Sequence, residues 1–391
     1  MHAIDVKTKT ELQPAIRAIS DLRRSDISFA GGKGANLGEL VHAGVSVPLG
    51  FVVGAPTYAA FVEHTGLRER ITERLAQVDV DDPAALESAA AEIRQLIDAE
   101  PVPVAIAEEI RSRYRELAGA DLEGRPVAVR SSATAEDTES ASFAGMNETL
   151  LNVRGEEAVV EAVRRCWSSL FGARTIFYRA KRGFGQADLD IAVIVQTQIA
   201  ATRAGVMFTV DPATGASDRL VIEGSFGLGE SVVSGAVSPD RYVVDKETLA
   251  IVAREIHPKV TAIEPHPEGG TMVHKLSPEE AVRPTLSDAE ACALAELGKA
   301  IEAHYSTPQD TEWAIDGDGR IWMLQSRPVT AVGEDAEPEE HEGIVLLKGL
   351  GAAPGGAAGQ VRILESIAEA DKFVDGGILV TRMTAPDWVP L

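Results

Sequence analysis

A lysine flanked by glycines is the first feature of this sequence that could bind phosphate. The string GGKG occupies residues 31–34, and Lys33 lies at its centre. Glycines let backbone amides approach an oxyanion closely, and a neighbouring lysine adds a positive charge. The string is not a Walker A loop, because the four-residue spacing to Gly-Lys-Ser/Thr is absent. Two interpretations stay open: a phosphate site, or a glycine turn that carries a surface lysine.

An arginine at the end of an apolar run is the second such feature. Residues 127–129 are Val-Ala-Val, Arg130 follows them, and residues 131–149 are rich in hydroxyl-bearing and small side chains. A guanidinium can bind two phosphate oxygens at once, and a flexible loop of small residues could cover a triphosphate. The alternative is a hydroxyl-rich surface loop.

A strong turn signal at residues 316–319, Asp-Gly-Asp-Gly, predicts a β-hairpin. The two strands would bring Glu312 close to Gln325, and Arg327 would point to the same face as Gln325 because side chains alternate along a strand. Carboxylate and amide oxygens suit Mg²⁺ held between a protein and nucleotide phosphates. The alternative is an ordinary hairpin with a surface ion pair.

The elements that would position these residues are a mixture of helices and strands. Apolar residues at three- and four-residue steps predict an amphipathic helix at 288–305, and 84–99 is a second, alanine-rich helical run. Residues 191–210 read as two β-rich runs joined by a polar turn, which predicts a hairpin. We expect an α/β protein in which this hairpin divides the first 330 residues into two lobes.

An acidic segment marks the clearest boundary in the chain. The string GEDAEPEEHEG at 333–343 has no apolar periodicity and predicts a solvated linker. The predicted organisation is a first lobe with a lid loop at 1–190, a second lobe at 191–330, a linker at 331–343, and the incomplete start of another domain at 344–391.

Composition excludes several classes of function. The 391 residues carry a formal net charge of −23, so a nucleic-acid partner is not expected. Cys166 and Cys292 are too few for a disulfide framework or a four-cysteine zinc site, and apolar runs are too short to cross a bilayer. No signal peptide is evident at the start of the sequence. These features favour a cytoplasmic protein without membrane spans.

Five strings together resemble the nucleotide-binding region of phosphoenolpyruvate synthases, the pyruvate, water dikinases. They span residues 31–330 and read GGKGANLGEL, AVRSSATAED followed by SFAG, GVMFTVDPATG, GSFGLGESVVSGAVSPDRY and DTEWAIDGDGRIWMLQSRPVT. The related pyruvate, phosphate dikinases share this plan but differ after the DPATG-like turn. The resemblance implies a two-lobed ATP-grasp fold that binds ATP and Mg²⁺.

The resemblance also assigns residues to the phosphates of the nucleotide. It places Lys33, Arg130 and Arg327 on the phosphates, as the residues that would act in phosphoryl transfer. Gly145 and Thr149 match positions in the lid beside them.

The remaining assignments concern the adenine and the metal. Gln196 matches a position between the lobes that lies against the adenine, while Glu312 and Gln325 match ligands on the Mg²⁺ side. Glu230, in GLGE, could orient the site, or it could be a buried structural carboxylate.

The segment after the linker resembles the opening of the family's swivelling phosphohistidine domain. None of the eight histidines lies in the family's phosphocarrier pattern, Thr-x-x-Gly-Gly-x-x-x-His, so the carrier is expected beyond Leu391. The implied reaction transfers the β,γ-phosphates of MgATP to that histidine, on the way from pyruvate to phosphoenolpyruvate, AMP and phosphate.

Pyruvate would then bind to further C-terminal domains, and a homodimer is one assembly left open. Two other functions also remain open. One is the ATP domain of an enzyme that resembles rifampin phosphotransferase. The other is a non-catalytic nucleotide-binding subunit of a multi-chain dikinase.

Overall fold

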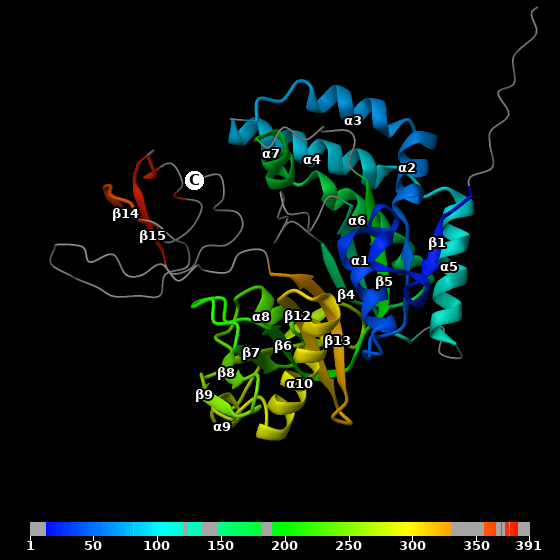
Figure 1. Ribbon diagram of the computed structural model, residues 1–391. Helices are drawn as coiled ribbons and strands as arrows, with labels where there is room; N and C mark the ends of the chain where they lie inside the picture. The colour runs from blue at the N-terminus through cyan, green and yellow to red at the C-terminus, as the bar shows by residue number, and fades with distance from the viewer. Residues whose placement is uncertain are drawn as a thin grey trace, which may run out of the picture.

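The computed structural model describes residues 13–80, 82–119, 124–134, 148–181, 190–329, 356–364, 369, 372–374 and 376–381. Most of the described residues form two lobes, each built around an antiparallel β-sheet with helices packed on it (Figure 1). The predicted mixed α/β class is confirmed. Within these ranges, no helix has both the length and the apolar composition that crossing a bilayer requires.

The first lobe is built on a five-stranded sheet in the order β1-β2-β5-β3-β4. Its strands are β1 (Ile16–Ala18), β2 (Gly50–Val53), β3 (Val127–Ala133), β4 (Thr149–Val153) and β5 (Ile191–Thr197). Alternate side chains of β5 enter two different cores: Ile191 and Val193 pack with Trp167, while Ala192 and Ile194 pack with Leu37. The continuous apolar run in β5 therefore reflects a central strand that is covered on both faces.

Helices cover both faces of this sheet. On one side lie α2 (Ala55–His64), α5 (Val104–Ala118) and α6 (Glu156–Ser168), with α3 (Leu67–Leu75), α4 (Pro83–Ala99) and α7 (Ala173–Lys181) outside them. On the other side lies α1 (Ile27–His42). Short 3₁₀ helices occur at Ile19–Asp21, Arg24–Asp26 and Ser169–Phe171.

The second lobe is built on a six-stranded sheet in the order β13-β12-β6-β7-β8-β9. The strands are β6 (Ala201–Phe208), β7 (Arg219–Phe226), β8 (Asp240–Asp245), β9 (Ile251–Glu255), β12 (Gln309–Asp316) and β13 (Ile321–Pro328). Helix α10 (Asp288–Tyr305) packs on one face, where Leu294 and Ile301 share a core with Met207 and Ile222. Ser287 caps α10 in a reciprocal pair with Glu290, so the predicted helix begins where its capping signal lies.

Smaller elements complete the described structure. A separate hairpin consists of β10 (Thr261–Pro265) and β11 (Thr271–Lys275), and the short helices are α8 (Glu230–Val233) and α9 (Pro278–Ala281). Two short strands, β14 (Val361–Ile363) and β15 (Ile378–Val380), pair in parallel. The predicted linker at 331–343 lies outside the described residues.

The predicted hairpin at 191–210 is wrong. Strand β5 pairs with β2 and β3 in the first sheet, whereas β6 pairs with β7 and β12 in the second. Residues 198–200 therefore connect two sheets instead of closing a turn. The chain passes from the first sheet to the second at these residues and not at residue 191. The physical reason is burial: β5 is buried from Ile191 to Gln196, which requires neighbours on both edges and cover on both faces.

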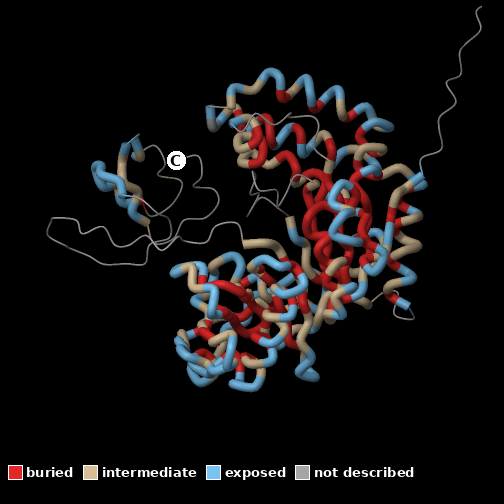
Figure 2. Tube along the Cα trace, in the orientation of Figure 1, coloured by how far each residue is buried: buried red, intermediate tan, exposed pale blue. Residues whose placement is uncertain are grey.

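The two lobes share one hydrophobic core along α1. Side chains of α1, including Leu37 and Leu40, belong to the same buried cluster as Ile301 and Met323 of the second lobe. In Figure 2 the buried parts of the chain lie in the interior of both lobes. At the end of α10, the Tyr305 hydroxyl donates to the carbonyl of Asn36, 3.2 Å away. Helix α1 is thus held by both lobes.

Candidate functional site

Arg130 reaches from the first sheet to the second. It stands on β3, and its guanidinium donates from Nη1 to the Leu324 carbonyl (2.9 Å), and from Nη2 to Glu312 Oε2 and Gln325 Oε1 (both 2.7 Å). The residue is only 9% exposed. Its Nε is buried, and no acceptor for it is found among the described residues. Arg130 therefore joins the lobes and keeps one buried donor for a further acceptor.

Glu312 and Gln325 lie directly opposite each other on β12 and β13. The prediction that the hairpin brings them together is confirmed. The turn forms as its residues predict: Asp316 Oδ1 accepts the backbone amides of Asp318 (3.1 Å) and Arg320 (2.9 Å). Since both side-chain oxygens lie 2.7 Å from the same nitrogen of Arg130, they converge on one point.

Arg327 lies next along this face and is paired with a residue that the sequence reasoning missed. Its Nε donates to Asp310 Oδ2 at 2.9 Å, and its Nη2 lies 2.8 Å from the same oxygen in an ion pair. Burial raises the pKa of the Asp310 carboxyl, Arg327 opposes this shift, and nearby Glu312 adds to it. The sequence could have indicated Asp310 as a site residue, because it stands two residues before Glu312 and so shares its face of the strand.

A second missed carboxylate lies on the same face of the second sheet. Glu312 is opposite Val206, and Val206 is opposite Glu223, so the two acids are two strands apart, about 10 Å. Burial raises the pKa of Glu223, with Arg241 opposing the shift. The sequence could have indicated Glu223, because it is a single acidic residue inside the apolar run of β7.

Lys33 lies in α1 immediately after a break in the helix. Gly31 has φ 67° and ψ 172°, and a Cβ there would lie 2.2 Å from Ser132 Oγ. The amide of Gly34 donates to the same hydroxyl at 3.3 Å, so the start of α1 abuts the end of β3, two residues beyond Arg130. Lys33 is 8% exposed.

The interpretation of GGKG as a glycine turn with a surface lysine is therefore wrong. Gly32 and Gly34 are helical, and Lys33 is buried. Gly34 and Gly38 are needed for packing instead: a Cβ at Gly34 would lie 2.9 Å from that of Ala30, and one at Gly38 would lie 2.5 Å from the Leu22 carbonyl oxygen.

The remaining predicted residues have mixed positions. Thr149 is exposed at the start of β4, opposite Arg130 in the strand register. Gln196 is buried, and its Nε2 donates to the Pro48 carbonyl at 3.2 Å. Glu230 is exposed at the start of α8, so its interpretation as a buried structural carboxylate is wrong. Gly145 lies outside the described residues.

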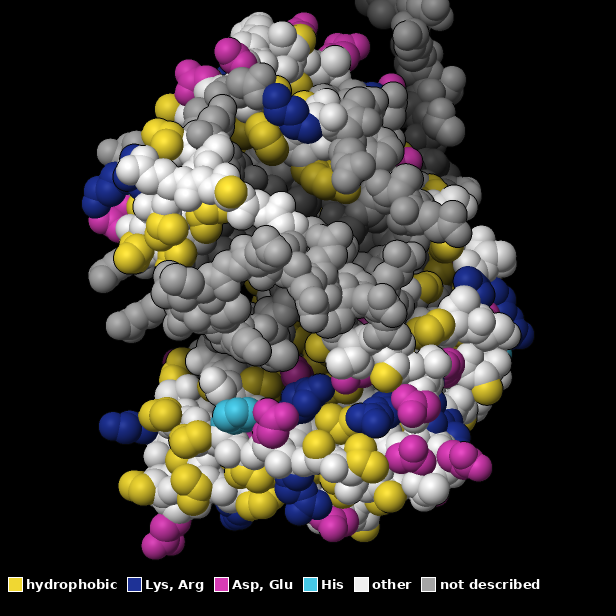
Figure 3. Space-filling model, turned by 60° about the vertical axis from the view of Figure 1, so that its left-hand side comes forward, with side chains coloured by type: hydrophobic (Ala, Val, Ile, Leu, Met, Phe, Trp, Pro, Cys, Tyr) yellow, Lys and Arg dark blue, Asp and Glu magenta, His cyan; other side chains and the backbone are white. Residues whose placement is uncertain are grey.

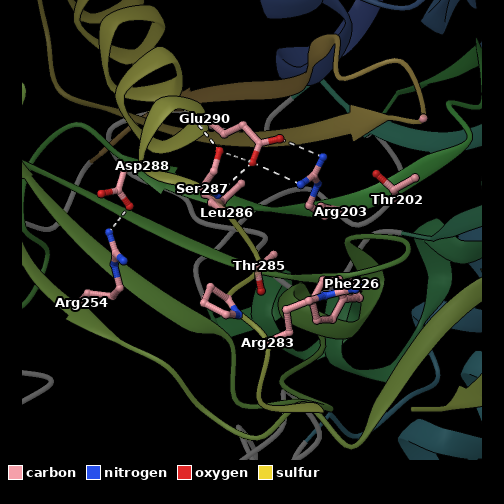
Figure 4. Close-up of a pocket in the computed structure, with 12 residues that line it drawn as sticks. Thr202, Arg203, Phe226, Arg254, Arg283, Thr285, Leu286, Ser287, Asp288 and Glu290 are labelled. Carbon is pink, nitrogen blue, oxygen red and sulfur yellow. Dashed lines mark hydrogen bonds and ion pairs between the residues drawn. The ribbon is translucent and has the colours of Figure 1, made fainter. Parts of the chain in front are cut away.

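A cavity of about 630 Å³ lies elsewhere, beside the start of α10 (Figure 4). Its charged walls are largely neutralised in pairs: Arg203 bonds to Glu290 at 2.8 Å, and Arg254 bonds to Asp288. Arg283 lies over the ring of Phe226, 5.0 Å from its centroid. None of the sequence-predicted residues lines this cavity, so we place the candidate site at Arg130 and its partners.

The visible surface of the second lobe carries both positive and negative side chains. On the face drawn in Figure 3, basic and acidic side chains are interspersed over this lobe. This agrees with a site that gathers charge locally instead of through a broad basic surface.

Comparison with known proteins identifies a nucleotide-binding region. Residues 27–345 match the family model described as "Pyruvate phosphate dikinase, AMP/ATP-binding domain". A probable phosphoenolpyruvate synthase from Methanothermobacter thermautotrophicus is 50% identical, over 95% of this chain and 54% of that protein. A probable phosphoenolpyruvate synthase from Archaeoglobus fulgidus is 47% identical, over 95% and 50%.

A phosphoenolpyruvate synthase from Pyrococcus furiosus is 42% identical, over 96% of this chain and 51% of that protein. The chain therefore spans about half the length of these relatives.

Proposed function

We propose, from the premise that this chain belongs to the pyruvate phosphate dikinase AMP/ATP-binding domain family, that its two lobes bind MgATP between them as the nucleotide-binding part of a phosphoenolpyruvate synthase. The observation that carries this proposal is the meeting of Arg130 with Glu312 and Gln325, which brings a cation from one sheet to oxygen donors on the other.

The chemistry of these residues suits phosphoryl transfer. Such reactions depend chiefly on positioning and on neutralising phosphate charge, so cations and oxygen donors are expected in place of a protein nucleophile. Lys33, Arg130 and Arg327 would contact phosphate oxygens. The buried Nε of Arg130 supports this role, because an unsatisfied buried donor costs about 1–3 kcal/mol that a phosphate oxygen could recover.

The donor set also fits Mg²⁺. Glu312 and Gln325 supply two hard oxygen donors that converge on one point, and Asp310 lies on the same face. Among the described residues, no group of three or more His, Cys, Asp or Glu side chains could hold a metal by itself. Two protein ligands completed by phosphates and water is the usual way that Mg²⁺ binds with a nucleotide, where it neutralises phosphate charge.

Arg130 and Glu312 currently neutralise each other, so nucleotide binding should change their partners. Nη2 of Arg130 holds the point on which the two oxygens converge. We expect the guanidinium to turn towards phosphate oxygens, which leaves Glu312 and Gln325 to the cation. Thr149 and Gly145 would belong to the lid, and Gln196 would lie near the adenine.

The proposed acceptor is a histidine outside residues 1–391, and the proposed final product is phosphoenolpyruvate formed from pyruvate. Two histidines of the described lobes have structural contacts, which fits an acceptor elsewhere: His304 Nε2 lies 2.7 Å from Glu39 Oε1, and His257 Nδ1 lies 2.8 Å from the Pro239 carbonyl.

Calorimetric titration with MgATP tests the binding proposal. Lys33→Ala should weaken binding by roughly ten- to a hundredfold, because a charge-assisted contact contributes about 1.5–3 kcal/mol. Lys275→Ala, which changes an exposed lysine on β11, should bind as the parent does. Absence of binding to the parent, or equal affinities for all three proteins, would contradict the proposal.

A further inference from the structure

A buried asparagine of the first lobe holds the tip of a hairpin from the second lobe. Asn152, on β4, is 0% exposed and has φ 54°. Its side-chain amide donates to the carbonyls of His266 (2.6 Å) and Gly270 (2.8 Å). Its own carbonyl accepts the amide of Gly270 at 3.2 Å. One residue thus makes three hydrogen bonds to the β10–β11 hairpin.

The hairpin tip is shaped for this contact. The His266 amide donates to the Gly270 carbonyl at 2.9 Å, and the Gly269 amide donates to the His266 carbonyl at 3.1 Å. Gly269 and Gly270 both have positive φ, at 112° and 71°, which other residues rarely adopt. This compact turn directs the two carbonyls at Asn152.

The first strand of the same hairpin is fixed to the second lobe at its central residue. The Leu228 amide, just after β7, donates to the Ile263 carbonyl at 2.8 Å, and Gly227 and Ile263 form a β-bridge. By contrast, all five residues of β11 are exposed, so this strand adds little to the core of the second lobe. The hairpin therefore spans from one lobe to the other, attached to the second lobe through the middle of β10 and to the first lobe through its tip.

Asn152 also contacts the segment that connects the sheets. Its backbone amide donates to Oε1 of Gln198, and the Gln198 amide donates to the Pro126 carbonyl of the first lobe at 3.0 Å. Oδ1 of Asn152 accepts from Arg154 Nε at 2.9 Å. Every polar group of Asn152 is therefore used, and the connection between the lobes is held at the same place.

Asparagine suits this position for two reasons. It tolerates positive φ better than most residues, and its amide offers two donors where aspartate offers none. We propose that Asn152 is a positioning residue: by fastening the hairpin beside residues 198–200, it fixes the angle between the lobes and hence the approach of Arg130 to Glu312. The effect on the lobe angle stands independently, and its effect on ATP binding rests on the proposed function.

Distance measurement between the lobes tests the proposal. Spin labels would be attached at Gln95→Cys and Glu247→Cys, exposed positions on the first and second lobes, in a Cys292→Ala background that leaves only the buried Cys166. Asn152→Gly keeps the positive φ and removes the side chain, whereas Asn152→Asp keeps the shape and removes the donors. Glu268→Ala, an exposed side chain at the hairpin tip, is the matched control.

Without nucleotide, the parent and Glu268→Ala should give one narrow distance distribution, and both Asn152 variants should give a broader or shifted one. Affinity for MgATP should fall about tenfold in both Asn152 variants. Lower thermal stability with an unchanged distance distribution would overturn the proposal, because it would reveal a local structural role only. A changed distribution with unchanged ATP affinity would support the effect on the lobe angle and overturn the effect on ATP binding. Failure of the parent to bind ATP would contradict the proposed function itself.

Discussion

The coupling free energy of the ion pair between Arg130 and Glu312 can be measured with a double-mutant cycle. The two side chains are 10% and 23% exposed and lie 2.7 Å apart. Opposite charges about 4 Å apart attract by about 4 kcal/mol near a protein surface, and desolvation and side-chain ordering offset part of that. We expect a coupling free energy of about 2 kcal/mol, within the range measured for contacting residues.

The single variants should differ in a way that the contacts dictate. Arg130→Ala removes the partner of Glu312, of Gln325 and of the Leu324 carbonyl together, so it should lower the free energy of unfolding by about 3–5 kcal/mol. Glu312→Ala leaves Arg130 bound to Gln325 and Leu324, so the loss should be nearer 2 kcal/mol.

Urea unfolding of the parent, both single variants and the double variant gives the coupling, and a helix pair provides the control. Arg113 and Glu109, four residues apart on α5, are 2.9 Å apart and both more than a third exposed. Their coupling should be only about 0.3–0.5 kcal/mol. If the Arg130–Glu312 coupling were as small as that of the control, the reasoning that this bridge holds the two lobes together would be refuted.

Two further predictions concern burial and packing. Burial raises the pKa of Glu223, so the folded state holds its proton to higher pH than the unfolded chain, and stability falls as the pH rises from about 4.3 through the raised value. Glu223→Gln should reduce this loss of stability, so the urea midpoints at about pH 4 and about pH 7 should differ less in the variant than in the parent. An equal difference in the two proteins would contradict this prediction. Gly38→Ala should destabilise by about 1–3 kcal/mol or more, because its Cβ would lie 2.5 Å from the Leu22 carbonyl oxygen, while Gly317→Ala, in open space, should change stability by less than about 0.5 kcal/mol. Equal thermal midpoints for these two variants would contradict the packing argument.

Local patterns predicted the parts of this protein that depend on neighbours in sequence. The turn at 316–319 sets the register that places Glu312 opposite Gln325, and apolar residues at three- and four-residue steps marked the helix that forms as α10. Both are decided within a few residues, so the sequence could predict them.

The features that local patterns did not predict depend on contacts between residues far apart in the sequence. The strands at 191–210 looked like a hairpin, but β5 pairs with strands at 50–53 and 127–133, which no local pattern specifies. Asn152 meets His266, 114 residues later, so its role could not be read from its neighbours. The glycines of GGKG suggested a loop, yet Gly31 is needed because α1 meets the end of β3 there, where a Cβ would lie 2.2 Å from Ser132 Oγ.

The central claim is that Glu312 and Gln325 hold Mg²⁺ beside ATP while Arg130 contacts its phosphates. Titration of ATP with and without Mg²⁺, in the parent, in Glu312→Ala and in the control Glu109→Ala, tests it most directly. We predict that Mg²⁺ strengthens ATP binding in the parent and in Glu109→Ala, and that Glu312→Ala loses most of this gain while it keeps more of the metal-free affinity. An equal response to Mg²⁺ in all three proteins would contradict the claim.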